Sequence, residues 1–258
     1  MMNEEEKARL SQLEQENARL REKLQSRDAF ISNTMGSYLP QEVLEEMLED
    51  RRSVEPQQRD VTILFSDIRS STALSEKMQL LDYMRLINHF LEEMIDIVNA
   101  WDGNILSFVG DSIVTVFGAP RRNPSAARDA VACAVAMQRL MPAVNAWNES
   151  QHYPEISMGI GIHSGQAILG NIGSDVRMKY DMIGRDVSLA SRIESFTEGG
   201  QILISSETLA AAGERVHLNP EGSRMIQPKG IHGEIQVHDV IGFGTHRTPR
   251  GKALGVEI

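Results

Sequence analysis

Apolar residues recur at helical spacing in three long segments of the chain. In residues 82–101 they mark one side of an expected helix, at Met84, Ile87, Leu91, Met94, Ile95 and Val98. Residues 125–150 and 182–196 show the same kind of pattern. A spacing of three and four residues is typical of an amphipathic helix that covers a core. The pattern therefore predicts three main helices.

Short apolar runs between these segments predict strands, and they read VTILF, GNILSF, DSIVTVFG and QILIS. GNILSF and DSIVTVFG meet at residues 109–111, where Gly110 favours a hairpin turn. Residues 156–173 predict a second strand pair that turns around His163, Ser164 and Gly165. Strands joined by hairpins and mixed with helices predict an α+β sandwich, in which helices cover a sheet.

Residues 1–31 form a segment of different composition, rich in Glu, Arg, Leu and Gln from residue 4 onward. Its heptad positions a and d are occupied by Leu10, Leu13, Asn17, Leu20, Leu24 and Ile31. An Asn at one a position is a known device for specifying a two-stranded parallel coiled coil. A solitary surface helix is the alternative, but a helix this polar has little reason to be stable alone. We therefore expect a parallel homodimer through this segment.

Residues 32–60 are expected to connect this helix to the following domain. Pro40 and Pro56 bracket a short segment with helical spacing at residues 41–50. The segment is predicted to be a helical connector that transmits changes from the coiled coil.

Composition and charge narrow the class of protein. The chain has 258 residues, which fits one large domain with an appendage. Its formal net charge of -10 argues against broad nucleic-acid binding, which needs a basic surface. The single cysteine, Cys133, lies in an apolar helical segment and is expected to be a buried thiol. No apolar run approaches the roughly 20 residues of a membrane helix. We expect a cytoplasmic protein, or the cytosolic portion of a longer one.

Two aspartates end or interrupt predicted strands. Asp67 follows the first apolar run, and Asp111 lies at the hairpin connection. If the two strands are neighbours, both carboxylates project from one sheet edge, where they suit a hard divalent cation such as Mg²⁺. Ser70, Ser71 and Thr72 follow in a small polar stretch that opens a helix, and its free N–H groups suit phosphate. Each feature alone is more often turn or cap chemistry.

Taken together and in order, the motifs resemble the class III adenylate/guanylate cyclase catalytic domain. They read FSDIRSSTALSE, VGDSIVTVFGAP, GIGIHSGQAILGNIGS, YDMIGRDVSLASRIES, QILIS and PKG. The resemblance covers roughly residues 58–242. It implies a ferredoxin-like βαββαβ sandwich at residues 61–243. Residues 244–258 contain Gly, Lys and Arg without periodicity, and we expect them to form a flexible tail.

The resemblance also implies a homodimer whose catalytic sites are each built from both chains. Two Mg²⁺ or Mn²⁺ ions per site would be bound by one chain, at Asp67, Ile68 and Asp111. The other chain would supply Asp181, which reads the purine edge, and Arg192, which stabilises the charged phosphate. Lys229 is implied to approach the triphosphate, with a less secure match. The expected substrate is ATP, with GTP as an alternative.

Two positions depart from the family pattern. Ser107 stands where the family has a purine-reading lysine, and Ser188 where it has an asparagine that orients the ribose. Loss of one preorganised polar contact typically costs about 10²–10³ in rate, so a weakened enzyme is expected rather than an inactive one. Asp181 suits the amine of adenine, which favours an adenylate cyclase with loose base selectivity. The alternatives are a guanylate cyclase, a degenerate cyclase-homology domain that binds nucleotide and signals, or a purely structural dimer.

Overall fold

The computed structural model describes residues 4–35, 43–44, 55–174, 176–231 and 233–253. The chain divides into two compact units, residues 1–53 and 54–258. In the first unit, α1 (Glu4–Met35) is one continuous helix, as the heptad pattern predicts. Its leucines Leu10, Leu13, Leu20 and Leu24 are all 48–55% exposed in the single chain. Pairing of this stripe in a coiled coil stays a prediction, and the expected helix at 41–50 lies outside the described residues except for 43–44.

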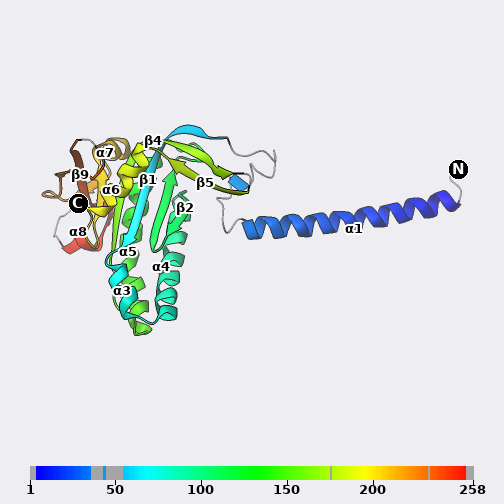
Figure 1. Ribbon diagram of the computed structural model, residues 1–258, viewed down its shortest axis with the longest axis horizontal. Helices are drawn as coiled ribbons and strands as arrows, with labels where there is room; N and C mark the ends of the chain where they lie inside the picture. Colours follow the sequence, from blue (N-terminus) through cyan, green and yellow to red (C-terminus); the bar gives the residue numbers. More distant parts are fainter. Residues whose placement is uncertain (1–3, 36–42, 45–54, 175, 232, 254–258) are drawn as a thin grey trace. The chain divides into compact units, whose positions relative to one another are not determined.

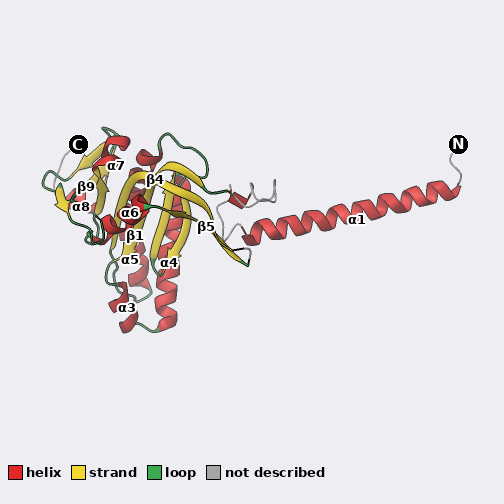
Figure 2. Ribbon diagram, turned by 45° about the horizontal axis from the view of Figure 1, so that its top comes forward, coloured by secondary structure: helices red, strands yellow, loops and turns green. Residues whose placement is uncertain are grey.

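The second unit is built on one large sheet with helices on both faces (Figures 1 and 2). Its strands are β1 (Gln57–Ile68), β2 (Asn104–Val109), β3 (Ser112–Phe117), β4 (Met158–Ser174), β5 (Arg177–Ile183), β6 (Ile202–Ser205), β7 (Val216–Leu218), β8 (Arg224–Ile226), β9 (Ile235–Phe243) and β10 (His246–Arg247). Its helices are α3 (Ser71–Lys77), α4 (Leu80–Ala100), α5 (Ala126–Ser150), α6 (Arg185–Ser195), α7 (Ser206–Ala212) and α8 (Pro249–Ala253). The strand order along the main path is β10-β9-β6-β4-β1-β3-β2, with β5 paired to β4.

The centre of this sheet confirms the predicted ferredoxin-like βαββαβ sandwich. Strands β4, β1, β3 and β2 lie in that order, and each neighbouring pair is antiparallel. The helix α4 connects β1 to β2, and α5 connects β3 to β4. These two helices pack side by side on one face and bury the main core, which includes Leu64, Phe90, Phe117, Val131 and Ile160 (Figure 1). Cys133 is buried in this core, as expected.

The strand pair predicted for residues 156–173 is wrong, because β4 is one continuous strand. Its central residues alternate between the two faces of the sheet. Ile160 and Ile162 face the main core, whereas a side chain at Gly161 would collide with the backbone of α6 at Glu194. Glycine here marks a close helix approach rather than a turn. At Gly165, in the expected turn, an added side chain would likewise collide with Asp186 of α6. This glycine was misread because close packing and tight turns both demand a residue without a side chain.

Two further segments differ from the expectation. The third predicted helix, 182–196, begins only at Arg185, and residues 177–183 form the unpredicted strand β5. The predicted irregular tail instead forms β10 and α8 over residues 246–253, where Thr248 is fully buried. Across the described residues, no helix has both the length and the apolar character needed to cross a membrane.

Candidate active site

Asp67 and Asp111 lie together on the side of the sheet where β1 ends and the β2–β3 hairpin turns, here called the carboxylate edge. Strands β1 and β3 are antiparallel neighbours, with Ser66 opposite Ile113, so the end of β1 meets the β2–β3 hairpin. The backbone N–H of Ile68 donates to Asp111 Oδ2 at 3.0 Å, and the Ser112 hydroxyl donates to Asp67 Oδ2. The two carboxylates expected from the sequence are therefore held side by side through neighbouring groups.

The electrostatics of this edge favour a positive charge between the carboxylates. Asp111 is only 9% exposed, and burial raises its pKa above the ordinary value. A hydrogen bond from the Ser71 side chain lowers this pKa, while the negative charge of Asp67 raises it further. Burial also raises the pKa of the neighbouring Tyr83 hydroxyl, and the negative charges of Asp111 and Asp67 add to this shift. Burial and the neighbouring negative charge of Asp67 therefore both disfavour the ionised form of Asp111.

Arg69 is a part of this site that the sequence analysis missed. Its guanidinium pairs with Asp67 Oδ1 at 2.9 Å and with Glu194 of α6. Burial raises the pKa of Glu194, and the Arg69 charge lowers it. Arg69, two residues after Asp67, therefore connects the carboxylate pair to α6. Its sequence position alone did not indicate this role, because the partner Glu194 lies 125 residues away.

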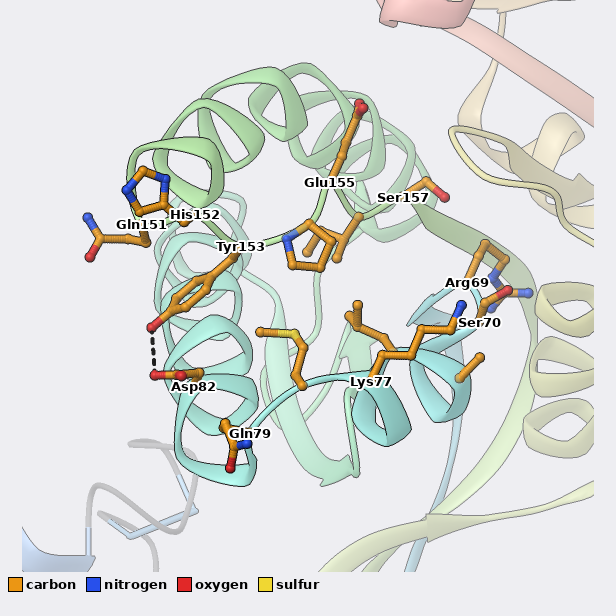
Figure 3. Close-up of a pocket in the computed structure, with 15 residues that line it drawn as sticks. Arg69, Ser70, Lys77, Gln79, Asp82, Gln151, His152, Tyr153, Glu155 and Ser157 are labelled. Carbon is orange, nitrogen blue, oxygen red and sulfur yellow. Dashed lines mark hydrogen bonds between the residues drawn. The ribbon is translucent and has the colours of Figure 1, made fainter.

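The stretch after β1 begins α3 beside the carboxylates. Ser70 adopts a left-handed conformation with φ of 61°, which turns the chain into the helix. Ser71 is tied to Asp111, while Thr72 is exposed. Arg69 and Ser70 also line a cavity of about 660 Å³, which lies between α3 and residues 151–157 (Figure 3). Neither Asp67 nor Asp111 lines that cavity, so it is separate from the carboxylate edge.

The residues expected to read the purine lie on β5 and β2. Asp181 is paired across the sheet with Gly170 of β4 and is partly exposed. Its Oδ1 accepts the backbone N–H of Met182 at 2.9 Å, which holds the carboxylate in one orientation. Ser107 lies directly after a bulge in β2, where the register with β3 shifts between Ile105 and Ser107. Bulges reorient side chains near functional sites.

Ser188 and Arg192 lie one helical turn apart on the exposed face of α6. The opposite face of the helix buries Leu189 and Ile193 against the sheet. Ser188 donates a long hydrogen bond of 3.4 Å to the carbonyl of Gly184. Lys229 is exposed in the loop between β8 and β9.

The predicted site residues therefore fall into two groups within one chain. Among the described residues, no hydrogen bond or ion pair joins Asp67, Ile68 or Asp111 to the second group, which consists of Ser107, Asp181, Ser188, Arg192 and Lys229. In the first group, Ile68 and Asp111 are buried and joined by a hydrogen bond while Asp67 is partly exposed, whereas most of the second group faces solvent. A single chain does not assemble them into one site by direct contact.

His163 is buried within the sheet and has a structural position. It is 3% exposed, and its Nδ1 lies 2.8 Å from the Ser205 hydroxyl. Burial lowers its pKa, although the nearby Asp186 and Glu207 oppose this shift. The buried, hydrogen-bonded ring connects β4 to β6 rather than facing the carboxylate edge.

Comparison with known proteins places these observations in a family context. Residues 54–241 match the family described as the adenylate and guanylate cyclase catalytic domain. Adenylate cyclase 1 of Rhizobium meliloti is 28% identical over 221 residues, which are 84% of this chain and 33% of that protein. This chain therefore spans about a third of the length of that curated relative.

Two solved structures of this kind resemble the chain closely. The guanylyl cyclase Cya2 is 42% identical, with a TM-score of 0.71, over 75% of this chain and 96% of the other. The adenylyl cyclase CyaB from P. aeruginosa is 35% identical, also with a TM-score of 0.71, over 75% and 99% of the two chains. The chain is thus similar to cyclases named for both purine nucleotides.

Proposed function

The chain belongs to the adenylate and guanylate cyclase catalytic domain family, and from this premise we propose that it converts ATP to 3′,5′-cyclic AMP and pyrophosphate. The observation that carries the proposal is the adjacent carboxylate pair of Asp67 and Asp111, in which Asp111 is buried and its pKa is raised by burial and by the charge of Asp67. A purely structural dimer has no need of such a pair. A buried charge without compensation destabilises a fold unless a cation completes it.

The donors at this edge fit Mg²⁺ or Mn²⁺. Hard cations take oxygen ligands, often from one or two carboxylates with substrate phosphates completing the shell. Asp67 and Asp111 supply the carboxylates, and Ile68 offers its backbone carbonyl, since its side chain has no donor. Two bound ions would polarise the reacting oxygens and offset the charge of the leaving pyrophosphate.

In the reaction, the ribose 3′-oxygen forms a bond to the α-phosphorus while the bond from that phosphorus to pyrophosphate breaks. The 3′-hydroxyl proton leaves to solvent or to phosphate. Arg192 balances the charge that develops on the phosphate oxygens, which is where preorganised cations contribute most. Ser188, one turn before Arg192, places a hydroxyl near the ribose in the position of a larger amide. Asp181 accepts from the base, and Lys229 contributes charge toward the triphosphate.

A second copy of the chain completes the site in this proposal. The exposed group of Asp181, Ser188 and Arg192 would face the carboxylate edge of the partner. The parallel coiled coil of α1 would hold the two chains together. This arrangement explains why one chain keeps the two groups apart.

Guanylate cyclase activity is the second candidate, and it is favoured by the 42% identity with Cya2. A nucleotide-binding module without turnover is the third, and it is favoured by the serines at positions 107 and 188.

Turnover measurements distinguish these candidates. The purified chain is assayed with ATP or GTP and with Mg²⁺ or Mn²⁺, beside Asp111→Ala and the matched control Asp96→Ala on the exposed side of α4. Cyclic AMP that disappears in Asp111→Ala but persists in the control supports the proposal. Cyclic GMP as the dominant product establishes the second candidate, and no product with either nucleotide at dimer-forming concentrations rejects both enzymes.

A further inference from the structure

Lys179 lies beside the base-reading aspartate in the folded chain. Residues 179 and 181 are two apart on β5, so their side chains share one face of the strand. Lys179 Nζ is 2.7 Å from Asp181 Oδ2. The other carboxylate oxygen, Oδ1, accepts the N–H of Met182, so the ammonium and the carboxylate are held in a defined pair.

This pair lies near position 107, where a serine stands in place of the family's purine-reading lysine. Cα atoms of β2, which carries Ser107, come within 8 Å of those of β5. The bulge in β2 directly precedes Ser107, where the register with β3 shifts. A serine hydroxyl both donates and accepts, whereas an ammonium only donates. The region therefore has a fixed donor, but that donor comes from β5 rather than β2.

We propose that Lys179 reads the purine edge together with Asp181, supplying from β5 the cationic donor that position 107 lacks. The inference rests on the proposed function, since it names a determinant of base binding at that same site. Adenine presents its amine as a donor beside the N1 acceptor. Asp181 accepts from the amine, and Lys179 donates to N1.

The pair also accounts for both purines as candidate substrates. Guanine presents the reverse pattern, a carbonyl acceptor beside an N1–H donor. The same ammonium and carboxylate match it if the base shifts so that Lys179 meets the carbonyl and Asp181 meets N1–H. Selectivity then depends on how the triphosphate places the base against the pair. This predicts weak discrimination, on the order of 10- to 200-fold between ATP and GTP.

An ordinary surface ion pair is the competing explanation. Lys179 is 51% exposed and Asp181 is 29% exposed in the single chain. Exposed pairs contribute little to stability, at about 0–1 kcal/mol. Under that explanation, removal of Lys179 changes neither nucleotide binding nor turnover.

The test compares Lys179→Met with Arg177→Met, a matched control two residues earlier on the same strand. Affinity is measured by calorimetry with 3′-deoxy-ATP, which lacks the attacking hydroxyl and therefore reports binding even if the chain has no turnover. Kinetics with ATP and GTP are measured in parallel, and thermal unfolding checks that each variant is folded.

We expect Lys179→Met to weaken 3′-deoxy-ATP binding and raise the KM for ATP by about 10-fold or more, while kcat changes less. The control should stay within about two-fold of the parent chain. Adding Ser107→Lys to Lys179→Met should restore most of the lost affinity, because a cation then returns to the base edge from β2. Equal affinities of Lys179→Met and Arg177→Met overturn the inference. So does a double variant as weak as Lys179→Met when Ser107→Lys alone binds normally, since Lys179 then acts structurally.

Failure of the proposed function would give a different experimental result. A chain without turnover that still loses 3′-deoxy-ATP affinity in Lys179→Met retains the base-reading pair and loses only the enzyme proposal.

Discussion

The two groups of candidate site residues differ in how the fold holds them. Asp67 and Asp111 end neighbouring strands, are bonded to Ser112 and Ile68, and are tied to α6 through Arg69. Asp181, Ser188 and Arg192 lie on a strand beyond the central sheet and on the outer face of a helix. The carboxylate edge is organised by its own chain. The second group has fixed backbone positions but open surroundings.

This difference indicates which part of the proposed cyclase reaction each group suits. Close carboxylates repel each other, so they need a rigid, hydrogen-bonded setting before a cation arrives. Groups that recognise a nucleotide must stay accessible until the nucleotide and a partner surface enclose them. Substitutions in one group at a time test whether the two groups have these separate roles.

The largest effect is expected from mixing two inactive variants. Asp111→Ala and Arg192→Ala should each reduce turnover by about 10²–10³ or more. In a mixed dimer, the intact carboxylate edge of one chain meets the intact Arg192 of the other. Co-expression should therefore restore up to about one quarter of wild-type activity, because half of randomly paired dimers carry one complete site out of two.

Cyclic nucleotide production by the separate and co-expressed variants makes this measurement. Two copies of Asp111→Ala with different tags provide the control, since they never form a complete site. Mixed dimers as inactive as either parent would show that both groups act within one chain.

A smaller gain is expected from Ser188→Asn. The longer amide reaches further from the exposed face of α6 toward the ribose, and no buried neighbour obstructs it. If one oriented contact is missing at this position, kcat/KM for ATP should rise by about 10-fold or more. Ser150→Asn at the exposed end of α5 is the matched control. A rise of equal size in the control, or a fall in Ser188→Asn, contradicts the role assigned to position 188.

The link between the two groups is expected to fail when α6 is pushed away from β4. Gly161→Ala places a methyl group against the backbone of Glu194, the partner of Arg69. Overpacking of this kind costs about 1–3 kcal/mol in the free energy of unfolding. Urea unfolding measures the loss, with Ser174→Ala at the exposed end of the same strand as a control. An unchanged unfolding midpoint would mean that α6 moves freely on the sheet.

The smallest effect concerns the pH dependence of stability. Burial lowers the pKa of His163 in the folded chain, so below about 6.5 the unfolded chain binds a proton that the folded chain excludes. Stability from this residue is complete above pH 6.5 and decreases as the pH falls toward the folded pKa, by up to about 1.4 kcal/mol per pH unit. His163→Gln should lose less stability than the parent between pH 7.5 and 5.5. Equal losses in urea unfolding at both pH values would show that other groups carry the acid sensitivity.

Much of the fold was predictable from pattern because its elements are regular. The helical spacing at 82–101 and the hairpin around Gly110 are local signals, and both are present as predicted. Gly165 in β4 was misread as part of a turn, since the group that leaves no space for a side chain there is Asp186 of α6, more than 20 residues later in the chain. Strand β5 was missed because its pairing with β4, rather than its own alternation, defines it.

The same distinction between local and long-range signals applies to the candidate site. Residue types and order in the chain pointed to Asp67 and Asp111, and the family resemblance implied roles for Asp181, Ser188, Arg192 and position 107, all of which stay predictions. Only the folded arrangement placed Arg69 between Asp67 and Glu194, and Lys179 on Asp181. Charge pairing depends on distances of a few ångströms in space. Those distances are set by strand register and helix packing, so linear order alone does not contain them.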